Sequence, residues 1–191
     1  MGNLIIGENI AMVKKYYEFK KEDIENGKYS AWKLIEPLWW DISIYDGIDK
    51  YNEDMKPFTD AQRKVFALFW YDSEVCNGGH DQFLFNSTGI VWKDALEGFK
   101  MIGADEYAAN FQKLIDILGG SIPYDRKERN ELMDKFYEKN DDEENDILGD
   151  IDDFYYELDL EEVLDEYVKK HASEFVINGI WAEVDERCIE D

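Results

Sequence analysis

The sequence has few of the residues from which disulfides, metal centres and membrane spans are built. It contains two cysteines, two histidines and three prolines in 191 residues. Two cysteines are too few for a disulfide framework, so we expect Cys76 and Cys188 to be reduced thiols. No run of eighteen apolar residues occurs, which excludes a transmembrane helix, and the first ten residues lack the basic and apolar regions of a signal peptide. We therefore expect a soluble, cytoplasmic protein that does not bind membranes.

Basic residues are also scarce, and this scarcity narrows the range of partners. Lysine and arginine number 21 against 45 aspartates and glutamates, which gives a formal net charge of -24. Nucleic acids and anionic membranes are bound through lysine and arginine, so direct binding to either is excluded. The charge instead favours basic proteins or cations. Because 45% of the residues are hydrophobic, the chain can still bury a core, and its length predicts one domain over residues 1–191.

Apolar residues recur at helical spacing through most of the chain, whereas the alternation typical of strands is almost absent. Thr59 is a suitable N-cap for the clearest helix, and Asp60 lies in its first turn. The predicted fold class is all-α, a compact single-domain multi-helix bundle with an acidic C-terminal helical region. Residues 41–56 stay ambiguous, and helices are predicted over residues 9–25, 29–40, 59–76, 81–85, 91–102, 104–118 and 126–139.

More than half of the net charge lies in one stretch near the C-terminus. Residues 138–166 hold fifteen acids and one base, Lys139, a net charge of -14. Residues 141–146 have no apolar stripe and predict a loop. The two segments after them do have one, so they predict amphipathic helices that hold their acids on outward faces. The stripes consist of Ile151, Phe154, Tyr155 and Leu158 in the first segment, and of Leu160, Val163, Leu164, Tyr167, Val168, His171 and Phe175 in the second.

The sequence contains none of the motifs of zinc proteases, serine hydrolases, P-loop proteins or dinucleotide-binding proteins. Cys76 and His80 lie close in sequence, but Cys76 sits on the apolar face of its predicted helix, where a cysteine is usually an inert core residue. His171 continues an apolar stripe, so we expect a packed or half-buried histidine. No EF-hand register fits, because the position that requires glycine is Asp146 in one register and Tyr155 in the other. We therefore expect no enzymatic activity, no cofactor and no dedicated metal site.

The most distinctive segment runs from Glu74 to Ser87 and contains an Asn-Gly-Gly turn. Glycines there permit the backbone conformations of a sharp turn between two helices. The residues that distinguish the segment, which we interpret as structural, are Glu74, Asn77, Gly78, Gly79, Gln82, Phe83 and Asn86. This set resembles the signature of a family of small acidic bacterial proteins, mostly of unknown function, that is named for a DNA-mimic protein.

The resemblance covers about residues 58–175. It extends downstream to Ala95-Leu96, to the Ile102-Gly103-Ala104 turn, and to Tyr167, His171 and Phe175. It implies an all-helical fold. It also implies a DNA mimic that occupies the nucleic-acid-binding site of a basic DNA-binding protein, such as a transcriptional regulator.

The acidic tract has a charge density on the scale of one nucleic acid strand. A strand of duplex DNA carries about one charge per 3.4 Å. If residues 138–166 formed one helix, its rise of about 1.5 Å per residue would give roughly 44 Å, or about one net charge per 3 Å. The acids predicted to contact the partner are Asp152, Asp153, Glu157, Glu161, Glu162, Asp165 and Glu166.

Three other functions stay open. An immunity or antitoxin-like protein that inhibits a basic nuclease would use the same electrostatics, and a divalent-cation-binding protein would use the clustered carboxylates. An enzyme would require a ligand-sized pocket beside Cys76, His80 and Gln82. Aromatic residues form 15% of the chain and leave room for a homodimer interface.

Overall fold

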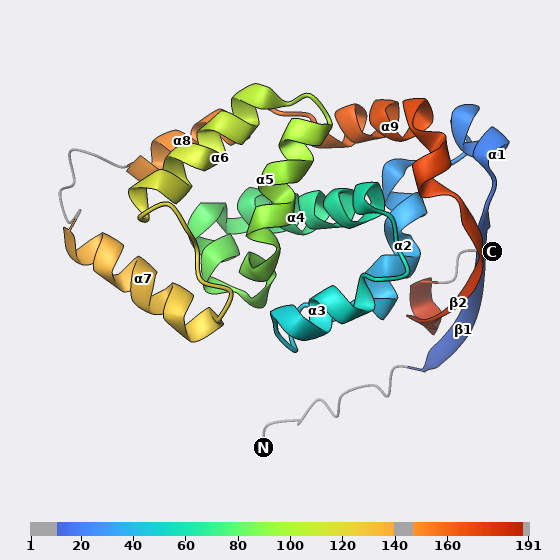
Figure 1. Ribbon diagram of the computed structural model, residues 1–191, viewed down its shortest axis with the longest axis horizontal. Coiled ribbons are helices and arrows are strands. Elements are labelled where there is room, and N and C mark those ends of the chain that lie inside the picture. The colour runs from blue at the N-terminus through green and yellow to red at the C-terminus, as the bar shows by residue number, and fades with distance from the viewer. Residues whose placement is uncertain (1–10, 140–146, 189–191) are drawn as a thin grey trace, which may run out of the picture.

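The longest helix, α4 (Asp60–Phe85), runs through the middle of the computed structural model, which describes residues 11–139 and 147–188 (Figure 1). Four consecutive residues of α4, from Val65 to Leu68, have no exposed surface. Four neighbours on a helix point in all directions, so α4 is covered on every side. The elements that pack against it are α2 (Ala31–Asp41), α5 (Trp92–Met101), α7 (Arg126–Lys139), α8 (Ile147–Tyr155) and the 3-10 helices η1 (Ser87–Val91) and η2 (Ala172–Phe175).

The remaining helices lie on this central layer. Helix α6 (Asp105–Ile117) packs on α5 and α8, and α9 (Leu160–Lys170) packs on α1 (Lys21–Glu25) and α2 (Figure 1). The buried apolar side chains form one continuous cluster. No helix in the described parts of the chain is both long and apolar enough to cross a membrane. The bounds of the helices not yet given are α3 (Ile48–Asp54) and the 3-10 helix η3 (Glu186–Cys188).

The predicted mainly helical fold is confirmed, and several helices begin and end where the sequence predicts. Thr59 forms a capping box with Gln62: its hydroxyl accepts a hydrogen bond from the Gln62 N–H, and the Gln62 amide oxygen accepts one from the Thr59 N–H. Gly103, after α5, has a positive φ of 79° and stands where the prediction ended that helix. Helix α7 has the bounds that were predicted. Residues 41–56 resolve into a loop and α3.

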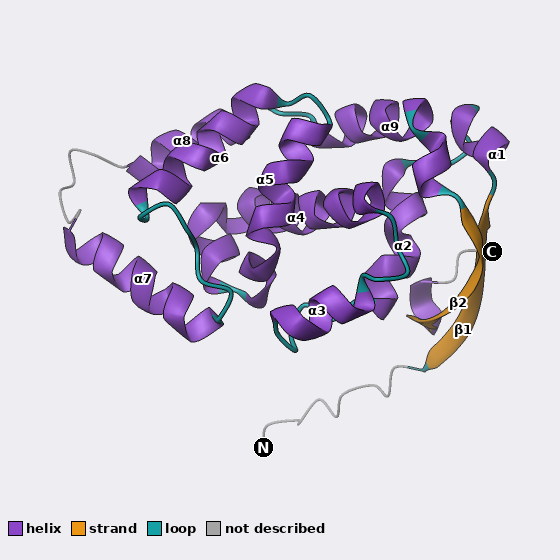
Figure 2. Ribbon diagram, in the orientation of Figure 1, coloured by secondary structure: helices purple, strands orange, loops and turns teal. Residues whose placement is uncertain are grey.

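The prediction of a helix over residues 9–25 is wrong. Residues Met12–Phe19 form strand β1, which pairs antiparallel with β2 (Ile177–Asp185) at the other end of the chain (Figure 2). Burial in β1 alternates with a period of two and places Tyr17 and Phe19 against the core. Only α1 of the predicted helix forms. The fold is therefore mainly helical with a two-stranded sheet, rather than all-α, and residues 9 and 10 lie outside the described part.

Helix α7 is fixed to the end of α4 by a buried arginine. Arg129 has no exposed surface. Its guanidinium donates to the carbonyls of Leu84 and Asn86, both at 2.6 Å, and of Pro123 and Tyr124, both at 3.1 Å. The first two carbonyls belong to the C-terminal end of α4, where the helix dipole favours a positive charge. Among the described residues, no carboxylate forms an ion pair with Arg129.

Candidate acidic binding surface

The Asn-Gly-Gly turn bends α4 without ending it. Gly78 and Gly79 have non-helical backbone angles inside the helix, and the chain returns to helix at once. Gly79 has φ 70° and ψ -176°, a region that is essentially restricted to glycine. The predicted helices 59–76 and 81–85 are therefore the two arms of a single kinked helix.

A carboxylate from α8 occupies the space beside this kink. A Cβ atom on Gly79 would lie 2.2 Å from Asp152 Oδ2. Asp152 Oδ1 accepts a hydrogen bond of 2.9 Å from the His80 backbone N–H and also contacts His80 Nδ1. Gly79 therefore has two physical roles, because it permits the kink and leaves room for the group that fixes α8 to α4.

Three polar residues of the motif join the two arms of the kink. Glu74 Oε2 accepts hydrogen bonds from Gln82 Nε2 at 2.7 Å and from Asn86 Nδ2 at 2.9 Å. Phe83 is fully buried and packs edge to face against Tyr71. Apart from Asn77, which is exposed, the motif residues thus contact one another or the core. This arrangement supports a structural interpretation of the motif.

The two residues considered as a thiol–imidazole pair point to different environments. His80 is fully buried, with Tyr71 on Nε2 and Asp152 on Nδ1. Cys76 is exposed, so the prediction of a core cysteine is wrong. Its Sγ donates to Asp72 at 3.5 Å. Both nitrogens of His80 are engaged elsewhere, and the imidazole cannot serve as the base for this thiol.

Cys76 should react slowly with alkylating agents. Partial burial and the negative charge of Asp72 raise the pKa of the thiol to about 11. At pH 8 roughly a thousandth of it would be thiolate, against about a quarter for a free cysteine with a pKa near 8.5. We expect iodoacetamide to modify Cys76 about two orders of magnitude more slowly than a free cysteine, as measured by peptide mass spectrometry. Asp72→Asn should increase the rate, and an unchanged rate would contradict the electrostatic cause.

Helix α8 is held by contacts beyond the Asp152 carboxylate. Tyr155 is buried, and its hydroxyl donates to Asp72 Oδ1 at 2.6 Å. The Ile151 carbonyl accepts a hydrogen bond of 2.8 Å from Asn110 of α6. These contacts, from both sides of α8, fix the direction in which its outward acids point.

The seven predicted contact acids do not all face solvent. Asp152 is turned inward, and its side chain is 17% exposed. Asp165 accepts a hydrogen bond of 2.6 Å from the Ala31 N–H, so it caps the first turn of α2. Glu166 pairs with Lys169 at 3.0 Å, and this contact lowers the pKa of its carboxyl group. The acids that are exposed and take part in no ion pair among the described residues are Asp153, Glu157, Glu161 and Glu162.

The two apolar stripes predict two separate helices, and the structure contains α8 and α9. The single-helix length used to estimate the charge density therefore does not describe this stretch. Helix α8 ends at Tyr155, α9 begins at Leu160, and the predicted loop 141–146 lies outside the described residues. The acids therefore follow two helices and the turn between them. Asp159 caps α9 by accepting a hydrogen bond from the Glu162 N–H at 3.1 Å. Glu161 and Glu162 lie in that first turn, where the helix dipole favours their charge.

Two further exposed acids, Asp105 and Glu106, lie in the first turn of α6, just after the turn that lies next to α9 in Figure 1. They follow Gly103, which lines the same groove as Glu162. The sequence analysis missed them because more than fifty residues separate them from the acidic tract. Together with the four exposed acids of α8, α9 and the turn between them, they define a surface called the acidic face below, which consists of Asp105, Glu106, Asp153, Glu157, Glu161 and Glu162.

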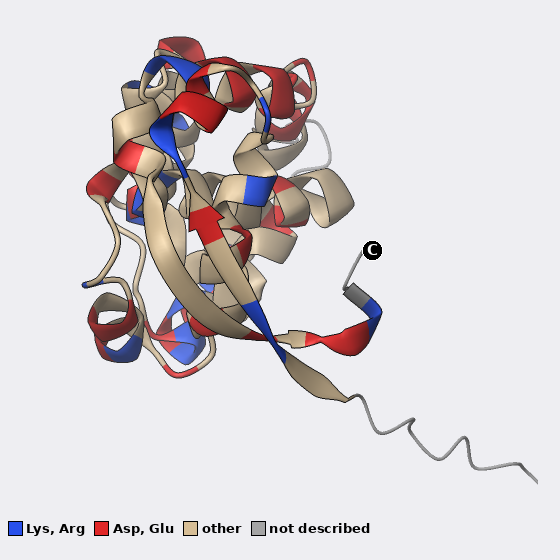
Figure 3. Cartoon of the chain, turned by 90° about the vertical axis from the view of Figure 1, so that its right-hand side faces the viewer, with Lys and Arg blue, Asp and Glu red and all other residues tan. Residues whose placement is uncertain are grey.

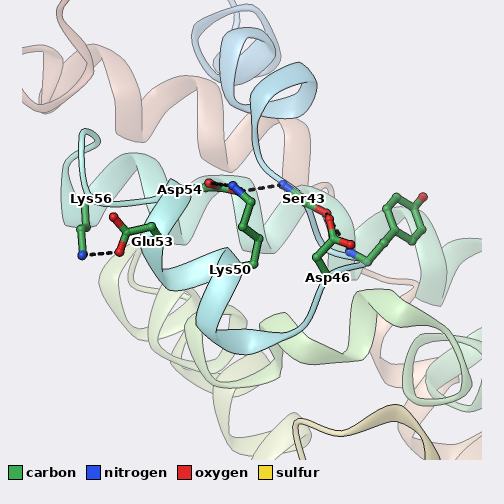
Figure 4. Close-up of polar contacts among 7 residues, drawn as sticks. Ser43, Asp46, Lys50, Glu53, Asp54 and Lys56 are labelled. Carbon is green, nitrogen blue, oxygen red and sulfur yellow. Dashed lines mark hydrogen bonds and ion pairs between the residues drawn. The ribbon is translucent and has the colours of Figure 1, made fainter.

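Several acids elsewhere on the chain are paired. In α3, Lys50 pairs with Asp54, and Glu53 pairs with Lys56 just beyond the helix (Figure 4). In the loop before α3, Ser43 Oγ donates to Asp46 Oδ2 at 2.7 Å (Figure 4). Figure 3 shows many red segments along the helices at the top of the view. The six acids of the acidic face differ from the paired acids of α3 in having no ion-pair partner among the described residues.

His171 lies at the C-terminal end of α9 and differs from its prediction. It is exposed rather than packed or half-buried. Its ring stacks on Tyr167, with centroids 4.2 Å apart and an angle of 18° between the planes. Among the described residues, no group of three or more His, Cys, Asp or Glu side chains is arranged to hold a metal ion.

A kinked central helix, a motif that fixes it to α8, and an acidic face on α6, α8 and α9 define a mainly helical acidic protein. Comparison with protein families identifies the family to which this chain belongs. Residues 56–171, more than half of the chain, match the DMP19-like protein family, and the chain belongs to that family. The match agrees with the predicted span of about 58–175 and leaves β1, α1, α2, α3 and β2 outside it. No curated protein and no solved structure matches the chain.

Proposed function

We propose that the protein is a DNA mimic whose acidic face occupies the nucleic-acid-binding site of a basic protein in the bacterial cytoplasm, such as a transcriptional regulator. The observation that carries the proposal is that the six acids of the face are exposed and take part in no ion pair among the described residues. Five of them stand on α6, α8 or α9, and Glu157 lies in the turn between α8 and α9. Buried contacts fix α8 to α4 and α6. Membership of the DMP19-like family supports the same function. The protein acts by binding and performs no catalysis.

The physical basis is electrostatic complementarity. Lysine and arginine that contact DNA phosphates are arranged for a regular array of negative charge, and carboxylates on a rigid surface present such an array. A rigid array loses little side-chain and backbone entropy on binding, whereas a flexible acidic tail would lose much more. Attraction between the two surfaces accelerates association and weakens as salt is added.

Neutralising the acidic face should weaken partner binding strongly. We expect the variant with Asp153→Asn, Glu157→Gln, Glu161→Gln and Glu162→Gln to lose at least tenfold in affinity at low salt, because four charges leave the contact. A matched control removes the same charge from exposed acids of α3 and α7 that take part in no ion pair among the described residues, through Asp49→Asn, Glu128→Gln, Asp134→Asn and Glu138→Gln. The control should lose less than about threefold. Equal losses in the two variants would show that net charge, and not this face, governs binding.

The partner for these measurements is the basic protein that the immobilised full chain retains from a lysate of the source organism. A DNA mimic requires that duplex DNA competes with the chain for this protein. Failure of duplex DNA to displace it would overturn the proposal. If the retained protein is a nuclease that the chain inhibits, the function is that of an immunity or antitoxin-like protein. Calorimetric titration with calcium tests the cation-binding alternative.

A further inference from the structure

A groove of about 480 Å³ lies beside the acidic face, between the end of α5 and the outer side of α9. Figure 1 shows the turn between α5 and α6 next to α9. Met101, Ile102 and Val163 line the groove and are only partly covered by the protein. This lining is apolar, and it offers contact to the hydrocarbon part of a long side chain rather than to a hydrated ion.

One part of the lining is aromatic. Tyr167 and His171 both line the groove, and their rings stack on each other. A planar guanidinium group binds to aromatic faces by stacking and by cation–π attraction, and it is more weakly hydrated than an ammonium group. An aromatic lining therefore distinguishes arginine from lysine, although both carry one positive charge.

The groove also carries carboxylates. Glu162 lines it and takes part in no ion pair among the described residues. Glu166 lines it too and is shared between Lys169 at 3.0 Å and Lys170 at 3.8 Å. Exposed pairs of this kind contribute little free energy, so an incoming guanidinium can displace the lysines at small cost. A guanidinium can then form two parallel hydrogen bonds with one carboxylate.

We propose that this groove binds an arginine side chain of the basic partner and prefers it to lysine. The proposal rests on the proposed function, since it names one contact within the same interface. The aliphatic stem of the arginine packs on Met101, Ile102 and Val163. Its guanidinium stacks on the aromatic lining and pairs with Glu162. A surface made only of carboxylates would not distinguish the two cations in this way.

The test compares two fluorescently labelled octapeptides of equal charge, one alternating arginine with glycine and the other alternating lysine with glycine. Binding to the full chain is measured by fluorescence anisotropy at low salt. We expect the arginine peptide to bind at least threefold more tightly than the lysine peptide. Tyr167→Leu should remove this preference, and the matched variant Tyr45→Leu, at an exposed tyrosine in the loop before α3, should keep it. His171→Ala, at an exposed position, tests the same aromatic lining should Tyr167→Leu fail to fold.

Equal affinities for the two peptides overturn the groove proposal, as does no measurable binding of either. A preference that survives both Tyr167→Leu and His171→Ala overturns it as well. The proposed function is judged separately with the fourfold variant of the acidic face. If that variant still loses affinity for both peptides while no preference exists, the groove fails and the acidic face stands. If it binds both peptides as tightly as the unaltered chain, the acidic face itself fails.

Discussion

Gly79→Ala should destabilise the protein by about 2–6 kcal/mol. The backbone angles of Gly79 would cost a residue with a Cβ roughly 1–3 kcal/mol. The added Cβ would also lie 2.2 Å from Asp152 Oδ2 and displace that carboxylate from the His80 N–H. Leaving that buried N–H unsatisfied costs roughly 1–3 kcal/mol more. Urea denaturation followed by circular dichroism measures the change.

A control separates backbone strain from the clash with Asp152. Gly120 also has a positive φ, 87°, but a Cβ there would meet no atom within 4 Å. Gly120→Ala should therefore cost only the strain, about 1–2 kcal/mol. In a double-mutant cycle, Gly79→Ala and Asp152→Ala should cost less together than the sum of the two, because both remove the same contact. If Gly79→Ala costs no more than Gly120→Ala, the Asp152 contact has no energetic importance.

This prediction links the family motif to the acidic face. Asp152 belongs to α8, and its contact with the kink of α4 helps to set where the neighbouring Asp153 points. Glu74 is the only charged residue of the motif, and its carboxylate accepts hydrogen bonds from Gln82 and Asn86. The effect of the motif residues on binding is therefore indirect, through the position of α8. Gly79→Ala should weaken binding less than neutralising the face does, provided the variant remains folded.

The helices could be predicted because their signals are local. The Thr59 capping box, the glycine at 103 and the apolar stripes of α7 and α9 each lie within a few residues of the boundary or face that they determine. Strand β1 has no such local signal. Val13 and Tyr17 fit a helical stripe as well as a strand, and the choice is made by pairing with Ile180 and Val184 of β2. The periodicity of one segment cannot reveal a pairing partner that lies so far away along the chain.

Prediction from local sequence meets the same limit for the single side chains of the acidic region. Helical periodicity separates inward apolar residues from outward acids, and it correctly places Glu161 and Glu162 at the surface. It cannot show that Asp165 reaches the N–H of Ala31, which is 134 residues away, or that Asp152 reaches His80. Both acids lie at the border of the apolar stripe, where a short side chain can turn either way. The contact depends on which backbone group the neighbouring helix leaves unpaired.

Arg129→Met should destabilise the protein by about 4 kcal/mol, because it leaves buried carbonyl groups without donors. The guanidinium donates to four carbonyls, two from the end of α4 and two from the segment before α7. Burial and the neighbouring Arg126 lower its pKa to about 10, so it still carries its charge at neutral pH. For a chain of this size, 4 kcal/mol corresponds to a decrease in Tm of roughly 8–16 °C. Thermal unfolding measures that decrease.

Arg126→Met is the matched control for this prediction. Arg126 lies one turn earlier in the same helix, is exposed, and donates to a single carbonyl, that of Phe85, at 2.8 Å. Its loss should cost less than about 1 kcal/mol, since water can satisfy the exposed carbonyl. Arg129→Lys keeps the charge but replaces the planar donor array with a compact ammonium group, so it should fall between the two. If Arg129→Lys is as stable as the unaltered chain, charge at the end of α4, rather than the set of four hydrogen bonds, is what fixes α7.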